Sequence, residues 1–291
     1  MTPLEMADAL SRDPDYRVLR RIQPRSIIPA HGTETRRALF VDTETTGLDP
    51  ASDEIIELAM TPFTYSTDGR IFEIDDSYRG LRQPSKPIPP EITAINGITN
   101  EMVAGQKIDV DEVAHFADGA APIIAHNAAF DRKFVEKLCP AFATKPWACS
   151  MSQVNWAAEG YEGTRLAYLI MEAGLFYDRH QATADCLAGI TLLTTTLPKS
   201  GTLAFSQLLG RGRRHTWRIW ATGSPFETKD ALKARGYAWH AGKKSWHTAV
   251  DEAARDAEIA WLCSDVYRRA VVPPMDRITA FDRFSAREIP A

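Results

Sequence analysis

The segment ALFVDTETTGL, residues 38–48, constrains the fold of this chain more than any other stretch. Four apolar residues typical of a strand run directly into two carboxylates, Asp42 and Glu44, and a Thr-Thr-Gly breaker follows. Because side chains alternate along a strand, both carboxylates leave the same face. Two like charges on a buried strand repel each other, which indicates a divalent cation between them. The alternative is a pair of solvated, inert acids at the frayed end of an edge strand.

Length and composition bound the class of protein. A chain of 291 residues fits one large domain, or a domain of about 170 residues with a smaller one. No apolar run approaches the ~20 residues of a membrane span, and the N-terminus lacks the basic start and apolar core of a secretory signal. The four cysteines show no CxxC spacing. We therefore expect a cytoplasmic protein with reduced thiols, no membrane association and no zinc site.

Residues 1–36 are expected to form an N-terminal extension. Residues 1–12 favour a short amphipathic helix, residues 15–22 a second short piece, and residues 24–35 a loop with two prolines. We expect this extension to pack against the main domain rather than to contact a partner or substrate.

Residues 37–198 have the pattern of an α/β domain. Strands are predicted at 37–43, 54–64 and 70–80, and the short turns between them indicate an antiparallel meander. A proline-rich loop at 83–99 follows. A short buried strand is expected at 121–125, and helices at 109–119, 128–138, 164–173 and 181–197. A meander followed by strand–helix alternation predicts a mixed sheet flanked by helices.

Two further polar islands fall on this scaffold. The first, AHNAAFD at 125–131, begins where the short strand stops and ends inside the next helix at Asp131. The second, HQATADC at 180–186, contains His180 and Asp185. Five residues turn a helix by about 500°, so these two side chains do not share a helix face. We expect His180 in the loop before the helix and Asp185 on its first turns.

These three islands resemble the motifs of the DEDDh 3′–5′ exonucleases. The first motif, DxExTG, is Asp42–Gly47; the second, HNxxFD, is His126–Asp131; the third, HxAxxD, is His180–Asp185. The match spans about residues 38–197, with the motifs in the right order and spacing. The resemblance implies a ribonuclease H-like α/β fold with a mixed five-stranded sheet. It also implies a nucleic-acid substrate attacked at its 3′ end.

The resemblance assigns a role to each acid. It implies that Asp42, Glu44, Asp131 and Asp185 hold two divalent ions, that Glu44 also takes part in catalysis, and that His180 acts on the attacking water. The chemistry agrees with these roles, because two cations can stabilise the attacking and leaving oxygens of a phosphodiester. Carboxylate ligands suit Mg²⁺ or Mn²⁺. A neutral histidine with a pKa near ~6.5 can accept the proton of the water.

Other matched positions are implied to contact the terminal nucleotide. Asn96 replaces a histidine that some relatives carry before the Gly of the GIT loop, so Ile95 is the better candidate for a wedge against a base. For Ile95 and Phe130 the alternative is core packing. The substrate-binding candidates are Thr45, Thr46, Gly47, Leu48, Ile95, His126, Asn127 and Phe130.

The C-terminal third differs in charge and composition. Residues 199–215 are predicted to be a basic linker and residues 216–291 a small α+β domain with several tryptophans. Between Lys199 and Lys244 there are ten Lys or Arg and two acids, a net charge of +8 in a chain of −4. Interleaved aromatic and basic residues favour nucleic-acid contact. The alternative is that the tryptophans form a small core and the charges a solvated face.

We therefore predict a metal-dependent 3′–5′ exonuclease that releases nucleoside 5′-monophosphates, with DNA favoured over RNA and single strands favoured over duplex. The alternatives are an exoribonuclease and a proofreading subunit that works within a polymerase assembly. A polymerase or repair partner is possible through FSQLL at 205–209, a candidate clamp-binding peptide. The sequence leaves the oligomeric state open.

Overall fold

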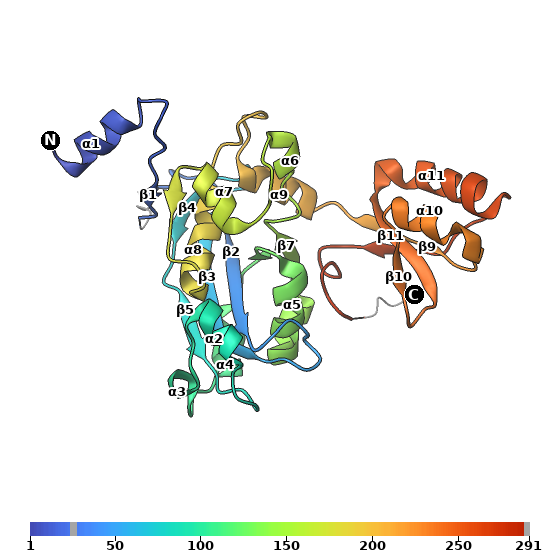
Figure 1. Ribbon diagram of the computed structural model, residues 1–291, viewed down its shortest axis with the longest axis horizontal. Coiled ribbons are helices and arrows are strands. Elements are labelled where there is room, and N and C mark those ends of the chain that lie inside the picture. Colours follow the sequence, from blue (N-terminus) through green and yellow to red (C-terminus); the bar gives the residue numbers. More distant parts are fainter. Residues whose placement is uncertain (24–27, 288–291) are drawn as a thin grey trace. The chain divides into compact units, whose positions relative to one another are not determined.

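The computed structural model describes residues 1–23 and 28–287 (Figure 1). Residues 24–27 of the predicted N-terminal loop lie outside the described residues. The backbone divides into two compact units, Met1–Gly212 and Arg213–Ala291. Among the described residues, no helix is long and apolar enough to cross a membrane.

Unit 1 is built around strand β2 (Arg36–Thr45). Its apolar residues Ala38, Leu39, Phe40 and Val41 are all fully buried, which places β2 in the middle of the sheet. Strand β3 (Ile55–Tyr65) pairs with it antiparallel and β6 (Ile123–Ala125) pairs with it parallel. The sheet order is β4-β3-β2-β6-β7, with β7 at Trp147–Cys149. The mixed sheet with flanking helices confirms the predicted fold class.

The predicted third strand, 70–80, is wrong in one respect, because the structure divides it in two. Strand β4 (Ile71–Ile74) pairs with Phe63–Tyr65, and β5 (Tyr78–Leu81) pairs with Glu57–Met60. Both are antiparallel to β3. The sheet therefore has six strands, although β4 and β5 occupy one position beside β3.

Helix α8 (Ala182–Leu193) covers one face of β2 and β3. Phe40, Ala59 and Cys186 meet there in the main core. Helix α5 (Ala128–Leu138) has the bounds that the sequence predicts and contacts β2, β6 and β7. Figure 1 shows these two helices on either side of the sheet. The remaining helices of this part are α2 (Pro90–Asn96), α3 (Asn100–Val103), α4 (Val110–Phe116), α6 (Trp156–Glu159), α7 (Leu166–Glu172) and α9 (Ala204–Gly212).

Two local expectations are corrected by this core. The loop predicted at 83–99 contains α2, because Pro90 stands at its first turn, where a missing N–H costs nothing. The segment FSQLL lies in α9, where Phe205, Leu208 and Leu209 are buried in the main core. Since its apolar side chains already pack inside unit 1, this segment is not an accessible clamp-binding peptide.

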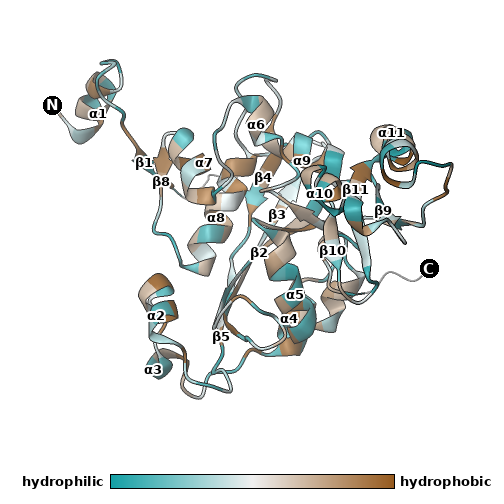
Figure 2. Cartoon of the chain, turned by 45° about the vertical axis from the view of Figure 1, so that its right-hand side comes forward, coloured by the Kyte–Doolittle hydropathy of each residue, from teal (hydrophilic) through white to brown (hydrophobic). Residues whose placement is uncertain are grey.

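The N-terminal extension touches the main domain through its second piece. Strand β1 (Arg20–Arg21) pairs with β8 (Leu175–Phe176), and Arg17 forms an ion pair with Glu172. Helix α1 (Pro3–Leu10) begins with a capping box at Thr2, but none of its residues is buried. Figure 2 shows both apolar and hydrophilic residues on this helix. The expected packing therefore holds for β1 and not for α1.

Unit 2 is a four-stranded antiparallel sheet with two helices on one face. The strand order is β10-β11-β9-β12, and a small core joins Ile219 and Ala221 to Leu232, Leu262 and Val266. Its elements are β9 (Thr216–Ala221), α10 (Lys229–Ala234), β10 (Ala238–His240), β11 (Ser245–Asp251), α11 (Glu252–Trp261), a π-helical turn (Leu262–Tyr267) and β12 (Met275–Ile278).

Candidate metal and active site

Strand β2 ends by presenting both motif carboxylates on one face. Asp42 and Glu44 are half-buried. Thr43, between them in the sequence, and Thr45, which follows Glu44, are buried on the other face. This alternation is the period of two that the sequence predicts. The pair therefore lies on a central strand, and the alternative of a frayed edge strand is wrong.

Helix α8 brings Asp185 to the same place. Gly189, one turn further along, lies directly against the ring of Phe40, and a Cβ there would stand 2.1 Å from Phe40 Cζ. This close approach holds the first turn of α8 against β2. Carboxylate oxygens of Asp42, Glu44 and Asp185 lie within 4.8 Å of one another, in a group that could hold a metal ion.

The fourth acid, Asp131, stands beside this group and is held by β2 itself. It is 3% exposed, and its Oδ1 accepts hydrogen bonds from the backbone N–H of Thr43 at 3.2 Å and from Thr43 Oγ1 at 2.9 Å. It lies near enough to Asp42 to be the strongest charge acting on that carboxyl. The structure thus brings together all four predicted acids, although Asp131 is outside the tight group of three.

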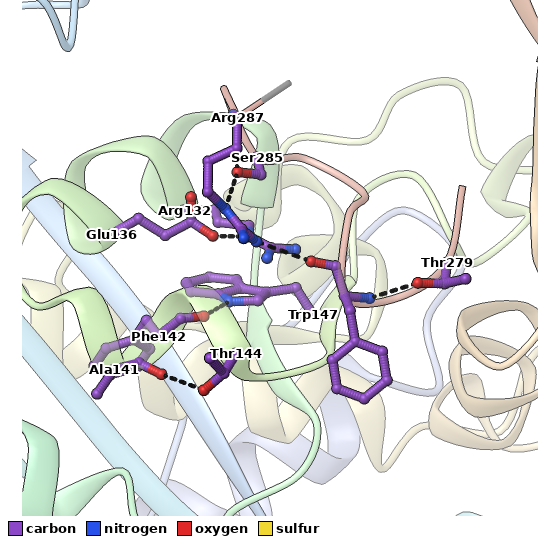
Figure 3. Close-up of polar contacts among 10 residues, drawn as sticks. Arg132, Glu136, Ala141, Phe142, Thr144, Trp147, Thr279, Ser285 and Arg287 are labelled. Carbon is purple, nitrogen blue, oxygen red and sulfur yellow. Dashed lines mark hydrogen bonds and ion pairs between the residues drawn. The ribbon is translucent and has the colours of Figure 1, made fainter. Parts of the chain in front are cut away.

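Packing behind Asp131 fixes its helix (Figure 3). Arg132 is fully buried, forms an ion pair with Glu136 at 2.7 Å, and has its guanidinium 5.5 Å from the centre of the Trp147 ring. Trp147 Nε1 donates a hydrogen bond to the carbonyl of Phe142 at 3.2 Å. These contacts tie α5 to β7 and so restrict where Asp131 can lie.

The electrostatics of the four acids are unfavourable without a counter-charge. Burial and the charges of Asp131 and Asp185 raise the pKa of Asp42 well above its usual value. Burial raises the pKa of Glu44 to about 7 and that of Asp131 to about 7. Burial also raises the pKa of Asp185. Carboxylates that resist ionisation because of burial and of one another's charges fit a site for hard cations, whose charge removes that cost.

His180 lies in the loop before α8, as the sequence predicts. Its backbone has φ 61°, in the left-handed region, and its side chain is exposed. The backbone N–H of His180 donates to Asp185 Oδ2 at 3.0 Å, so the loop and the helix are linked at this point. The imidazole is therefore next to the acids and open to a substrate.

Side-chain hydrogen bonds brace the TTGL turn. Thr45 Oγ1 donates to the carbonyl of Gly47 at 2.6 Å, and Thr46 Oγ1 donates to Asp53 Oδ1 at 3.1 Å. The carboxyl of Asp53 lies over Gly47, where a Cβ would stand 2.5 Å from Asp53 Oδ2. Glycine is thus required here for a close approach. Leu48 is 83% exposed at the end of this turn.

Two of the other predicted substrate residues, Ile95 and Phe130, differ in how far their side chains are exposed. Ile95 is 57% exposed at the end of α2, so its side chain is not part of the core. Phe130 is half-buried, with its ring centre 4.9 Å from that of Phe134. Asn96, beside Ile95, donates from Nδ2 to Glu44 Oε2 at 3.2 Å. Asn96 therefore orients a carboxylate of the cluster.

His126 and Asn127 shape the backbone between β6 and α5. Burial lowers the pKa of His126 to about 4, so its ring is neutral near pH 7. Its Nε2 donates to the carbonyl of Thr164 at 2.7 Å and its Nδ1 is 2.9 Å from Ser150 Oγ. Both ring nitrogens are thus engaged by the protein. Asn127 has φ 89°, a left-handed conformation that asparagine tolerates.

Sequence reasoning missed several supporting residues. Tyr177 Oη donates to Asp185 Oδ1 at 2.6 Å. Glu57, 1% exposed, lies opposite Glu44 in the β2–β3 register, forms an ion pair with Arg79 and accepts from the N–H of Ala182 at 3.4 Å. Glu57 could have been singled out from the sequence, because it is a charged residue inside the apolar run IIELAM. No feature of the sequence pointed to Tyr177.

An adjoining pocket of about 560 Å³ extends the site. It runs from Glu57 and Arg79 to the 96–98 loop and His180, and its lining also includes Met102, Gln181 and Thr183. The acids, the exposed histidine and this open space lie side by side. The arrangement can hold cations and admit a ligand to them.

Comparisons with known proteins agree with this geometry. A family profile described as exonuclease matches residues 39–193, more than half of the chain. A DNA polymerase III subunit epsilon of Treponema pallidum is 30% identical over 166 residues, which cover 54% of this chain and 74% of that protein. Exodeoxyribonuclease 10 of Escherichia coli is 30% identical over 169 residues, covering 56% and 69%.

Other matches cover a smaller share of the matched protein's own length. A DNA polymerase III subunit epsilon-like protein of Rhodobacter capsulatus is 32% identical over 189 residues, but the match spans only 26% of its length. Among solved structures, apo exonuclease I is similar with a TM-score of 0.51 and 16% identity, covering 86% of this chain and 63% of that one. At this identity the likeness concerns the fold alone.

Proposed function

The chain belongs to the exonuclease family whose profile covers residues 39–193, and we propose that it is a metal-dependent 3′–5′ exonuclease releasing nucleoside 5′-monophosphates. Membership makes it a nuclease of the hydrolase class and agrees with the resemblance to the DEDDh exonucleases. The single observation that carries the proposal is the grouping of Asp42, Glu44 and Asp185 within 4.8 Å, with Asp131 beside them.

The four acids are proposed to hold two divalent cations, Mg²⁺ or Mn²⁺. When bound, such cations neutralise the attacked phosphate and lower the pKa of a water. The protein's own residues set the ligand positions. Asn96 orients Glu44, Tyr177 orients Asp185, and Thr43 orients Asp131. Glu44 and Asp131 each keep an oxygen that these donors do not occupy, whereas Asp185 Oδ2 also accepts from the backbone N–H of His180.

His180 is proposed as the general base. Its side chain is exposed, and its backbone is tied to Asp185, so the imidazole stays at the edge of the acid cluster. A neutral imidazole nitrogen there can take the proton from a water that attacks the phosphorus. Replacing His180 should therefore lower kcat more than it raises KM.

The terminal nucleotide is proposed to lie between the TTGL turn and the end of α2. Leu48 and Ile95 are exposed apolar side chains, and Phe130 is a half-buried ring. Hydrogen bonds from Thr45 and Thr46 brace the backbone of this region. His126 and Asn127 are proposed to support the substrate through the backbone of the turn that leads into α5.

DNA is the proposed substrate, with single-stranded or frayed 3′ ends preferred. The names of two relatives support DNA, since one is an exodeoxyribonuclease and the other a subunit of a DNA polymerase. An exoribonuclease with the same chemistry is the alternative. The polymerase relative also supports a second candidate role as a proofreading subunit within an assembly.

The test is digestion of matched DNA and RNA strands, single and double stranded, labelled at either end. We expect 5′-labelled single-stranded DNA to shorten progressively with Mg²⁺ or Mn²⁺ and to stay intact with EDTA. We expect 3′-labelled strands to release the label as a mononucleotide at once. Endonucleolytic fragments, or hydrolysis that persists in EDTA, would contradict the proposal.

A further inference from the structure

Unit 2 carries exposed aromatic rings at two neighbouring places. Phe226, just before α10, is 74% exposed, and Trp239 on β10 is 52% exposed. Large apolar side chains this open in a small domain have no role in its core. Their positions are connected by three further residues into one surface, which we call the aromatic–lysine stripe: Phe226, Lys229, Lys233, Trp239 and Trp246.

Contacts within the stripe run from one end to the other. Lys229 Nζ lies 4.3 Å from the centre of the Phe226 ring. Lys233 follows Lys229 by one helical turn and so lies on the same side of α10. Its Nζ is 5.9 Å from the ring of Trp246, which lies 5.5 Å from the ring of Trp239. The two lysines of α10 therefore lie between Phe226 at one end of the stripe and the Trp246–Trp239 pair at the other.

The other three tryptophans of unit 2 are not available in this way. Trp217 and Trp261 pack against the small core, and Trp220 is 3% exposed with its Nε1 bonded to Asp276 at 2.7 Å. For these residues the core interpretation of the tryptophans is the better one. Trp246 also packs against this core, so the exposed rings of the stripe are Phe226 and Trp239.

Both lysines of the stripe also lack acidic partners. Within residues 1–23 and 28–287, neither Lys229 nor Lys233 forms a salt bridge, whereas Arg235 and Arg255 on the same unit do. Two lysines that the described residues leave without a salt bridge favour contact with an anionic ligand.

We propose that the stripe binds single-stranded nucleic acid, with bases stacked on Phe226 and Trp239 and phosphates neutralised by Lys229 and Lys233. An aromatic face accepts any base, and only a single strand has base faces to offer. Each lysine that meets a phosphate releases counterions and adds to the salt dependence of binding. The inference rests on the proposed exonuclease function only for the expectation that the protein encounters single strands.

The experiment measures binding of a 5′-fluorescent deoxythymidylate strand to the full chain in EDTA, over a salt titration. The stripe variants are the pair F226A/W239A and the pair K229Q/K233Q. Losing one stacked base lowers affinity about tenfold. We expect F226A/W239A to weaken binding at every salt concentration. We expect K229Q/K233Q to reduce the slope of log K against log salt by about 1.4.

The matched control is R268Q/R269Q, which removes two exposed positive charges from the same unit outside the stripe. Circular dichroism establishes that each variant is folded, and because Phe226, Lys233 and Trp239 are exposed, their replacement leaves the core intact. Equal losses of affinity in the control and in both stripe pairs would overturn the proposal. So would preferential binding of duplex over single strands.

A second readout separates this inference from the proposed function. The ratio of kcat/KM for a long strand to that for a dinucleotide should fall in both stripe pairs and not in the control. If the unmodified protein hydrolyses neither substrate, the proposed function fails while the binding result still decides on the stripe. If it hydrolyses both and the ratio is unchanged in the stripe pairs, the stripe proposal fails alone.

Discussion

Two carboxylate sites of this protein, each wholly or partly buried, differ in how the negative charge is balanced. In unit 2, Glu258 is 8% exposed and accepts hydrogen bonds from Arg235 Nε at 3.0 Å and from Tyr237 Oη at 2.9 Å. In unit 1, Asp42 and Glu44 face Asp131 and Asp185, and burial together with these like charges raises the pKa of Asp42 well above its usual value.

The difference separates a structural acid from a ligand-binding acid. Glu258 has a cation within the protein, so its charge is compensated as soon as unit 2 folds. Among the described residues, Asp42, Glu44, Asp131 and Asp185 form no salt bridge with a basic side chain, so their mutual repulsion is relieved only when an external cation binds. A carboxylate cluster whose pKa values all rise is therefore a marker of function, whereas burial of an acid alone is not.

The largest expected effect is on catalysis. Asp42→Asn should lower kcat/KM by about 10³-fold or more, because a lost cation ligand removes several kcal/mol of charge stabilisation. The matched change Glu258→Gln also neutralises a buried carboxylate but should leave kcat per folded molecule unchanged. Rates of mononucleotide release under saturating Mn²⁺ measure both, and equal losses would erase the distinction between the two sites.

The next effect is on the stability of the metal-free protein. The pKa of Glu44 is raised to about 7 in the folded protein. Its contribution to the stability of the fold is therefore fully present below about pH 4.5, and it is lost as the pH rises through 7. The shift corresponds to about 3 kcal/mol for Glu44 alone. In EDTA, the Tm of the unmodified chain should therefore fall between pH 5 and pH 8.

The variant D42N/E44Q tests this directly. It should be more stable than the unmodified protein at pH 8 in EDTA and should lose most of the fall in Tm with pH. Glu258→Gln should do the reverse, lowering stability by about 1–2 kcal/mol because Arg235 loses its charged partner. Denaturant unfolding in EDTA measures both variants, and a less stable D42N/E44Q would refute the electrostatic account.

A smaller effect concerns the packing that builds the cluster. Gly189→Ala should destabilise unit 1 by about 1–3 kcal/mol, because its Cβ would overlap the Phe40 ring and push α8 from β2. Gly210→Ala is the matched control in α9, where the new Cβ meets nothing within 4 Å, and it should stabilise by up to about 1 kcal/mol. Thermal melts of the two variants should therefore move in opposite directions.

The smallest effect concerns orientation of one acid. Tyr177→Phe removes the hydrogen bond to Asp185 Oδ1, which is worth about 1 kcal/mol. We expect kcat to fall about fivefold, with the Mn²⁺ concentration for half-maximal activity rising and the KM for DNA unchanged. A change in KM alone would place Tyr177 in substrate binding instead.

Local signals in the sequence were sufficient for the elements that carry the acids. The apolar run before Asp42 predicted a strand, the alternation predicted a shared face, and α5 has its predicted bounds at 128–138. The position of His180 before α8 followed from helix geometry alone. Bringing Asp131 and Asp185 to β2 required the family resemblance, because no local pattern gives the pairing of β6 with β2 or the packing of α8 on β2.

The features that sequence reasoning missed depend on contacts between distant residues. The division of 70–80 into β4 and β5 follows from how each half pairs with β3. Glu57 is placed opposite Glu44 by strand register, and Tyr177 reaches Asp185 through the fold of the loop before α8. The separation of stripe tryptophans from core tryptophans in unit 2 required the sheet and its helices.

The most direct test of the central claim is a thermal melt of the full chain at pH 8 with increasing Mg²⁺ or Mn²⁺, alongside D42N/E44Q. We expect the Tm of the unmodified protein to rise with metal concentration, by the equivalent of about 2.7 kcal/mol at one hundred times the Kd, and that of the variant to stay constant. A Tm of the unmodified protein that does not respond to millimolar Mg²⁺ or Mn²⁺ would contradict the assignment of these four carboxylates as a cation site.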